Sequence, residues 1–447
     1  SDQTITLGSV DAYYIGRFYG DTNYNMDGEI GYLRIWDEAR TEAEIRESMF
    51  KRTPTDSGNK CKINLLFDEG TGTTVDNIGQ SGDAGDATLN AALWAGAGDF
   101  NGTVNMSSGS TSTNYNNSAK LIMNGAGKSL NYISGEILPH LNIANTSGTI
   151  TANAISGTNN LTVASLTTEG GSSEFTAPAG TLTITAENTD GMAFELGAFN
   201  SADPSTYKHN NGTVTFNNHS APAVHAVIIC GQSTSTDGLY NVIIDGANTI
   251  VSTYQGTNGT YIYNNYTHTN GNLKANGASN TFTVLGNVSL NGGNMFNSGN
   301  APTGAHTYGS LTQESGTTYK ATTGTTTLKS ENSNYAIYNK SGSTFTHSGG
   351  LIKIETPAST QIRNQATGVW NSLEIDNDGN LCEYRYTNMT HAGDLTVNAN
   401  DTLRMSGDTS YKFEFAGDAS ISGTLDGGTN SASGSWSFGS LTIASGG

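Results

Sequence analysis

The sequence has little charge, little proline and little cysteine. Only 13% of the 447 residues are charged, and proline occurs 7 times and cysteine 3 times. A disordered chain of this polarity carries more Pro, Lys and Glu, so the composition argues against disorder. The cysteines, Cys61, Cys230 and Cys382, lie far apart in sequence and fit neither a disulfide framework nor a zinc site. We expect them to be small buried apolar side chains.

Basic residues are also scarce, with 20 Lys and Arg against 39 Asp and Glu and a net charge of −19. This balance argues against nucleic acid as a partner, because phosphate binding needs clustered basic residues. It also disfavours an anionic membrane surface, and no apolar run reaches the roughly 18 residues that membrane insertion requires. The sequence begins without an initiator Met or a signal peptide, so we expect a processed protein or a part of a longer one.

Glycine, aromatic and β-branched residues dominate what is present. The chain has 56 Gly, 20 Tyr and 14 Phe among many Thr, Val and Ile, which is typical of strands and turns. Charge density changes near residue 100: residues 1–100 hold 17 acidic and 8 basic side chains, and residues 101–447 hold 22 and 12. We therefore predict an all-β protein with two parts, residues 1–102 and residues 103–447.

The first part contains one predicted helix. Thr41 and Glu44 have the spacing of a capping box, in which each side chain bonds the other residue's backbone N–H. Ile45, Met49 and Phe50 follow as an apolar face, and the helix is expected to end near residues 51–52, before Pro54. Strands are predicted on either side of the helix, at residues 30–36 and 63–67.

The same part resembles a known family. Residues 26–45, with a Gly-x-Ile strand, an aromatic position, a helix cap and Glu44-Ile45, are similar to the final strand and helix of concanavalin A-like (laminin G-like) jelly-roll domains. Residues 65–76 are similar to the opening strands of that family. The resemblance implies a partial jelly-roll β-sandwich over residues 20–100. Two features depart from it: the opening motif follows the closing one, and Gly31 replaces an acidic residue that the family often carries.

The second part consists of apolar-x-apolar triplets between Gly, Asn and Ser turns. Their period of two predicts short strands at irregular intervals. Irregular coils with recurrent strand cores favour an irregular β-solenoid, and the alternative is a string of small β-sandwiches. The segment also resembles the Gly/Ser/Thr/Asn-rich β-helical portions of phage fibre and bacterial surface proteins. The triplets include Leu161–Val163, Leu182–Ile184, Val214–Phe216, Val242–Ile244, Phe282–Val284, Leu395–Val397 and Leu441–Ile443.

One loop has the composition of a calcium site. Asp21, Asn23, Asn25 and Asp27 offer side-chain oxygens at alternate positions, and Ca²⁺ takes six to eight oxygen ligands. The loop is not an EF-hand, because Arg34 occupies the position of the bidentate Glu. The alternative is an ordinary Asx-rich turn.

Glu374 and Asp376 form the strongest carboxylate pair. They lie on one predicted strand face with Cα atoms roughly 7 Å apart, within the range that glycosidases use. This pair carries the hypothesis of a tailspike-like polysaccharide depolymerase. The alternative is a solvated strand face that ends in an Asp-Gly turn, and Trp370 is the only nearby tryptophan that could serve as a sugar platform.

Tyrosines offer a different kind of site. Tyr261, Tyr263 and Tyr266 stand in an Asn-rich stretch, where aromatic rings could stack on sugars beside hydrogen-bonding neighbours. The alternative is an aromatic ladder inside the solenoid.

These patterns together predict a protein that is not an enzyme. We expect an extracellular structural or adhesive protein at a virion or cell surface, either a phage virion fibre that contacts host glycans or a bacterial surface adhesin. The expected partners are other copies of the chain, as in a homotrimer, or other surface proteins, and glycans. Ca²⁺ is the one cofactor that the loop at residues 21–27 suggests.

Overall fold

The structure is a computed structural model of the 447-residue chain. It separates into two compact units, Ser1–Gly96 and Ala97–Gly447, so that the boundary falls six residues before the one predicted from composition. The structure describes residues 32–48, 60–66, 74–81, 87–88, 98–100, 104–105, 120–135, 137–169, 173–186, 192–196, 207–217, 226–229, 234–253, 259–275, 279, 281–297, 301–330, 332, 334–366, 368–385, 388–406, 411–427 and 435–444.

The first unit combines short antiparallel pairs with one helix. Strand β1 (Leu33–Trp36) pairs with β2 (Cys61–Leu65), and β3 (Thr74–Val75) pairs with β4 (Ala87–Thr88). Both predicted strand regions therefore contain strands that pair with each other. Residues 30–31 lie outside the described residues, as does the predicted continuation of the helix at residues 49–52.

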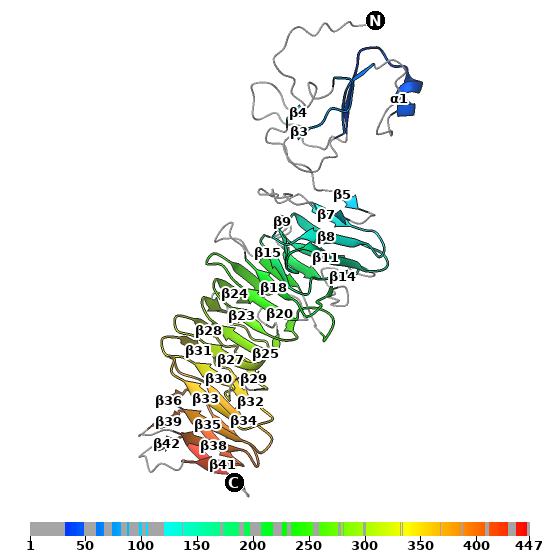
Figure 1. The fold of residues 1–447 in the computed structure, drawn as a ribbon. Helices are drawn as coiled ribbons and strands as arrows, with labels where there is room; N and C mark the ends of the chain where they lie inside the picture. Colours follow the sequence, from blue (N-terminus) through cyan, green and yellow to red (C-terminus); the bar gives the residue numbers. More distant parts are fainter. Residues whose placement is uncertain are drawn as a thin grey trace. The chain divides into compact units, whose positions relative to one another are not determined.

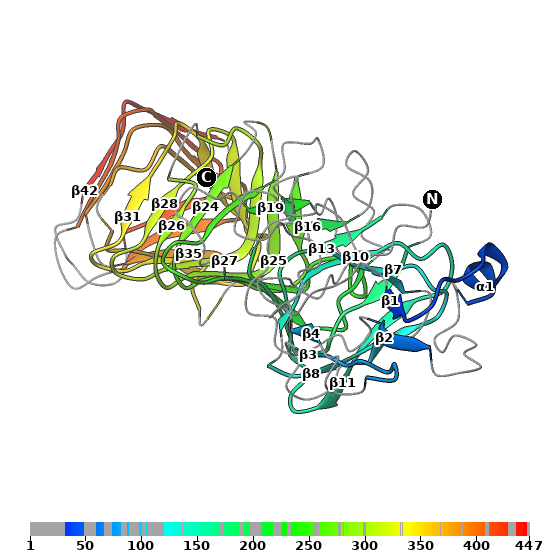
Figure 2. The ribbon, with the colours of Figure 1, turned by 90° about the horizontal axis from the view of Figure 1, so that it is seen from above.

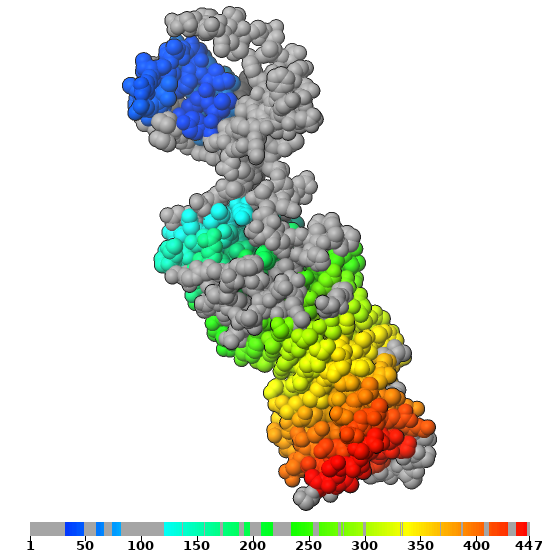
Figure 3. Space-filling view, turned by 180° about the vertical axis from the view of Figure 1, so that it is seen from behind, coloured from blue at the N-terminus to red at the C-terminus, as the bar shows by residue number. Residues whose placement is uncertain are grey.

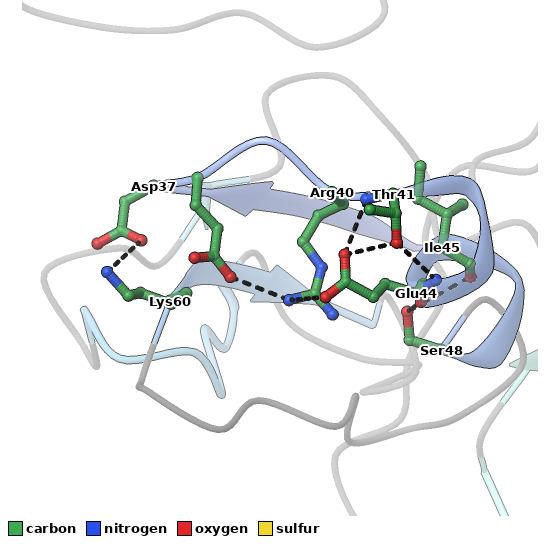
Figure 4. A network of polar contacts seen from close by, with 8 residues as sticks. Asp37, Arg40, Thr41, Glu44, Ile45, Ser48 and Lys60 are labelled. Atoms are coloured by element: carbon green, nitrogen blue, oxygen red, sulfur yellow. Dashed lines mark hydrogen bonds and ion pairs between the residues drawn. The ribbon is translucent and has the colours of Figure 1, made fainter.

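The helix α1 (Glu42–Ser48) begins at the predicted capping box, which Figure 4 shows. Glu44 N donates to Thr41 Oγ1 at 3.4 Å, and Thr41 N donates to a Glu44 carboxylate oxygen at 2.8 Å. These two bonds satisfy backbone donors that a helix start leaves open. Ile45, expected on the buried face, is 52% exposed.

The second unit is a β-solenoid over residues 120–443. Each coil adds strands to three stacks, and every pairing between the named strands of this unit is parallel. Figure 1 shows the strands following one another in sequence order. The predicted solenoid is thus confirmed, and the string of small sandwiches is wrong, since a sandwich pairs its strands antiparallel.

Stack 1 consists of an 11-stranded and a 3-stranded sheet, and Figure 2 shows its labelled strands side by side in sequence order. Trp370 takes the place of a strand between β31 and β36, through an isolated bridge to His391. The strands of stack 1 are β5 (Gly98–Phe100), β7 (Lys120–Met123), β10 (His140–Ile143), β13 (Leu166–Thr168), β16 (Met192–Leu196), β19 (Ala226–Ile229), β21 (Ile250–Thr253), β24 (Asn272–Ala275), β26 (Asn294–Met295), β28 (Thr318–Lys320), β31 (Thr344–Thr346), β36 (Met389–His391), β39 (Lys412–Phe415) and β42 (Ser435–Ser437).

Stack 2 starts with five strands and continues, through a bridge from Leu239 to Ile262, into a second series. The first series is β6 (Val104–Asn105), β8 (Ser129–Ile133), β11 (Ile150–Ser156), β14 (Phe175–Thr176) and β17 (Tyr207–Lys208). The second series is β22 (Thr260–Ile262), the first halves of β25 (Phe282–Leu290) and β27 (His306–Gln313), then β29 (Thr325–Leu328), β32 (Leu351–Ile354), β34 (Ser372–Ile375), β37 (Leu395–Val397), β40 (Asp418–Ile421) and β43 (Ser440–Ile443).

Stack 3 includes the second halves of β25 and β27, because these two long strands turn from one stack into the next at a break in register. The other members of stack 3 are β9 (Ile137–Leu138), β12 (Leu161–Val163), β15 (Thr181–Ile184), β18 (Thr213–Phe216), β20 (Asn241–Ile244), β23 (Tyr266–His268), β30 (Ile337–Asn339), β33 (Thr360–Asn364), β35 (Leu381–Arg385), β38 (Thr402–Ser406) and β41 (Thr424–Asp426).

The core is one apolar column along the solenoid. Leu182 and Ile184 of β15 lie in register with Val214 and Phe216 of β18, and all four side chains are buried. This arrangement recurs from coil to coil, so a single buried cluster extends from Leu121 to Ile421. Figure 3 shows the coils between the green and red parts as successive bands of the surface. One coil alone could not bury its apolar side chains, and neighbouring coils supply the cover.

The cysteines agree with their predicted role where they are described. Cys61 and Cys382 are both buried, and Cys230 lies outside the described residues.

Candidate functional site

The strongest candidate surface is a group of three half-buried tyrosines, Tyr240, Tyr261 and Tyr263, between stacks 2 and 3. We call it the tyrosine strip. The rings of Tyr240 and Tyr263 are stacked, with centroids 5.9 Å apart and planes 21° apart. Tyr263 N donates to Leu239 O, and Asn264 N to Tyr240 O, both at 2.8 Å. These backbone bonds place corresponding residues of successive coils above one another, about 4.8 Å apart.

His209 extends this stack by one ring. Its ring lies 4.7 Å from that of Tyr240, with planes 29° apart. Nδ1 accepts a hydrogen bond from Asn211 N at 2.9 Å, so the proton is on Nε2, which lies 3.1 Å from Thr234 O. Burial lowers the pKa of His209, which keeps the imidazole neutral. The row of three rings therefore presents no formal charge at neutral pH.

Tyr261 projects outward from β22, between the buried residues Thr260 and Ile262. Burial and the neighbouring Tyr263 raise the pKa of Tyr261. Its phenol therefore keeps its proton at neutral pH and can both donate and accept a hydrogen bond.

A row of amides runs beside the strip on the outer side of stack 3. Asn265 N lies 3.3 Å from Asn241 Oδ1, and Asn287 N lies 2.9 Å from Asn265 Oδ1. Ser310 Oγ continues the row by donating to Asn287 Oδ1 at 2.7 Å. The row was not predicted from the sequence. Its signal is an Asn placed directly before Val242, Tyr266 and Val288, which are buried residues of successive strands.

Tyr266 is not part of the surface, and the expectation that it is exposed was wrong. Its side chain is 1% exposed and its ring meets Phe282 edge-on at 5.7 Å. Its register partners are Val242 and Val288, both core residues, so alternation along β23 points Tyr266 inward. The three tyrosines thus divide, with Tyr261 and Tyr263 on the outside and Tyr266 in the aromatic core that was the alternative.

The strip has the chemistry of a weak sugar platform. Tyrosine has a flat apolar ring and a polar hydroxyl at its edge. Tyr240 is stacked between His209 and Tyr263, so its edge and hydroxyl, rather than its faces, are what it can offer to a sugar. The adjacent amides add donors and acceptors at the spacing of the coils. Successive units of a long glycan could meet equivalent groups on successive coils.

Glu374 and Asp376 lie in an ion cluster around Lys353. Lys353 Nζ is 2.6 Å from Asp376 Oδ2 and 3.4 Å from Glu374 Oε1, and Asn398 Nδ2 donates to Glu374 Oε1 at 3.2 Å. The hydrogen bond from Lys353 lowers the pKa of Asp376. A glycosidase pairs one ionised carboxylate with one protonated acid, so Asp376 suits only the role of base, and Glu374, which contacts Lys353 and Asn398, would have to be the acid.

The predicted calcium loop, Asp21, Asn23, Asn25 and Asp27, lies outside the described residues. Within the described ranges, no three His, Cys, Asp or Glu side chains come together as a metal site. The calcium site therefore stays a prediction. Over the same ranges, the structure contains no helix with the length and apolarity to cross a membrane.

Comparison of the chain with protein-family models, with curated proteins and with solved structures finds no match. Function therefore has to be argued from the surface chemistry of the solenoid.

Proposed function

We propose that the chain is a non-enzymatic extracellular structural and adhesive protein. In this proposal it is a phage virion fibre, or another virion structural component, that contacts host-surface glycans. A bacterial cell-surface adhesin or filament protein is the alternative, and it would use the same surface chemistry.

The tyrosine strip carries this proposal. Tyr261 projects from strand β22, and Tyr240 and Tyr263 lie directly beside strand ends and are joined by backbone hydrogen bonds between coils, so little ordering entropy is lost on binding. A parallel stack with one continuous core is also a stiff support for a contact surface. The ion cluster at Lys353 supports the non-enzymatic form of the proposal, since Lys353 and Asn398 contact Glu374, the carboxylate that would have to act as the acid.

The first unit adds a second proposed contact. Residues 26–45 and 65–76 resemble a concanavalin A-like jelly roll, so we propose a lectin-like role for residues 1–102, with Ca²⁺ at Asp21, Asn23, Asn25 and Asp27. Self-association, as a homotrimer or with other surface proteins, would make many weak sugar contacts act together.

Glycan-array binding of the full chain tests the proposal. We expect binding of at least one surface polysaccharide by the wild type, and loss of at least about 1.4 kcal/mol, or tenfold in affinity, in the double variant Tyr240→Ala/Tyr263→Ala. Tyr411→Ala is a matched control, because Tyr411 is a half-buried tyrosine of the second unit that lies outside the tyrosine strip.

Equal binding by the double variant would remove the tyrosine strip from the proposal. Absence of binding to every glycan, with and without Ca²⁺, would remove the adhesive function itself.

A further inference from the structure

The arginines of the second unit gather in one place. After Arg52 the sequence contains three arginines, Arg363, Arg385 and Arg404. They lie on three successive strands of stack 3, β33, β35 and β38. Their strand neighbours Ile362, Tyr384 and Leu403 are buried, so all three arginine side chains project outward. We call these three residues the arginine ladder.

Register places the ladder at the spacing of the coils. Arg363 and Arg385 are direct partners in the pairing of β33 with β35, and Arg404 lies opposite Glu383 in the next pairing. Neighbouring parallel strands are about 4.8 Å apart. Three guanidinium groups thus occupy adjacent coils on one outer surface of a chain whose net charge is −19.

Arg363 is held in position by its surroundings. Its Nε donates to Gln361 Oε1 at 2.7 Å, and its Cζ lies 5.3 Å from the ring centroid of Tyr335 and 5.5 Å from that of Tyr338. The two rings meet edge to face at 5.2 Å. Lys340 Nζ adds a second cation 5.6 Å from the Tyr338 ring. Ordering a free arginine side chain costs about 2 kcal/mol of rotamer entropy. These contacts already restrict Arg363, so a ligand that binds it loses less of that entropy.

The other two arginines make ion pairs that a ligand can exchange. Arg385 Nη2 is 2.6 Å from Glu383 Oε2, and Arg404 Nε is 2.7 Å from Asp426 Oδ2. Both arginine side chains are 35% exposed. Asp426 is similarly exposed at 33%, whereas Glu383 is 14% exposed. The Arg404–Asp426 pair is therefore accessible to water and contributes only about 0–1 kcal/mol, so an incoming oxyanion has little to displace at Arg404.

We propose that the arginine ladder binds an acidic polysaccharide, through the carboxylate or sulfate groups of successive sugar units. The guanidinium fork matches planar oxyanions, and adjacent coils present it repeatedly along a linear polymer. Tyr335 and Tyr338 add aromatic surface beside the charged groups. This inference rests on the proposed glycan contact and deepens it: the tyrosine strip is neutral, whereas the ladder selects acidic sugars.

Binding of three soluble polymers to the full chain tests the ladder: alginate as a polyuronate, dextran sulfate, and neutral dextran. We expect the wild type to bind at least one of the two acidic polymers at low salt and more weakly at high salt, because exposed charges are screened. The triple variant Arg363→Gln/Arg385→Gln/Arg404→Gln should lose at least tenfold in that affinity. The single variant Arg363→Lys should lose only part of the wild-type affinity, since lysine keeps the charge but lacks the planar guanidinium fork.

Lys329→Gln is the matched control, because Lys329 is a cation on the outside of stack 2 that pairs with Glu355 at 2.7 Å. Circular dichroism of each variant checks that the strands are retained. Equal binding of the acidic polymers by the triple variant and the wild type would overturn the inference. It would also be overturned if the wild type bound neither acidic polymer, or bound neutral dextran as tightly as the acidic glycans. Single-stranded DNA is the fourth polymer of the test, and equally tight binding of this polyanion would overturn the inference as well.

The two proposals fail in different ways. If the wild type binds neutral glycans but no acidic ones, the arginine-ladder inference is wrong and the proposal for the tyrosine strip is unaffected. Absence of binding to neutral and acidic glycans alike removes the proposed function as well.

Discussion

The hydroxyl of Tyr266 lies 2.8 Å from Nδ1 of His268, two residues further along β23, and both side chains are inside the solenoid. His268 Nε2 lies 3.1 Å from Gly271 O, so Nε2 carries the proton and Nδ1 accepts from the phenol. Tyr308 and His306 repeat the contact at 3.0 Å. The apolar column inside the solenoid therefore contains Tyr–His pairs whose hydrogen bonds require neutral imidazoles.

The first prediction concerns acid. Burial lowers the pKa of His268 from 6.5 to about 4, and those of His306 and His391 to about 3. Below pH 6.5 these histidines become protonated in the unfolded chain but stay neutral in the folded chain. The free energy of unfolding is therefore highest above pH 6.5 and falls as the pH drops toward the pKa values of the folded state. We expect the free energy of unfolding to fall by about 2 kcal/mol for each of these histidines by about pH 5. Denaturant unfolding at a series of pH values measures it.

Two variants identify the source of this slope. His268→Gln should reduce the pH dependence by the share of one histidine, and His268→Gln/His306→Gln by the share of two. Stability that stays constant from neutral pH to about pH 5 would contradict the prediction.

The second prediction concerns the buried carboxylate of Asp401. Its two oxygens accept from Gly379 N at 2.7 Å and from Asn377 N at 3.1 Å, and so fix a turn of the preceding coil. Asp401→Ala removes the acceptor of two backbone N–H groups, of which that of Asn377 is buried, and we expect a loss of about 2 kcal/mol. Chemical denaturation measures the change. Glu414→Ala, at an exposed strand position, should stay within about 0.5 kcal/mol, and an equally small effect at Asp401 would be inconsistent with this role.

The third prediction concerns Trp370, which replaces a strand in stack 1. Its side chain is fully buried and lies between Phe345 and His391, with ring centroids 5.1 and 5.8 Å away. Trp370→Ala would leave a large cavity at the point where this coil has no strand in stack 1. We expect a loss of about 3–5 kcal/mol in the free energy of unfolding.

Trp436→Ala provides the comparison, because Trp436 is only partly buried against the core. We expect it to cost less than Trp370→Ala in thermal and denaturant unfolding. A larger loss at Trp436 would show that the coil at Trp370 tolerates the cavity.

The fourth prediction concerns the carboxylate pair. Because Lys353 and Asn398 contact the carboxylate of Glu374, which would have to act as the acid, we expect the wild type to release no reducing ends from the polysaccharides that it binds. A reducing-sugar assay measures this directly. Release that disappears in Glu374→Gln, with glycan binding retained, would restore the depolymerase hypothesis.

Local pattern predicted the strand content and the helix start well. The capping box at Thr41 and Glu44 and the strands from Leu161 to Ile443 depend on neighbours within a few residues. The exposure of Ile45 could not be read in this way, since what covers a helix face comes from distant parts of the chain. The same holds for Tyr266, which stands in an Asn-rich stretch that reads as surface.

The sequence by itself determined that this protein is all-β and that its second part is a stack of short strands. The reason is that alternation and turn residues act over a few positions. Only the tertiary structure decided which side chains meet across coils: Tyr240 with Tyr263, Arg363 with Arg385, and Lys353 with Asp376. Such contacts depend on the register between strands that are twenty or more residues apart, and irregular coil lengths conceal that register from local pattern.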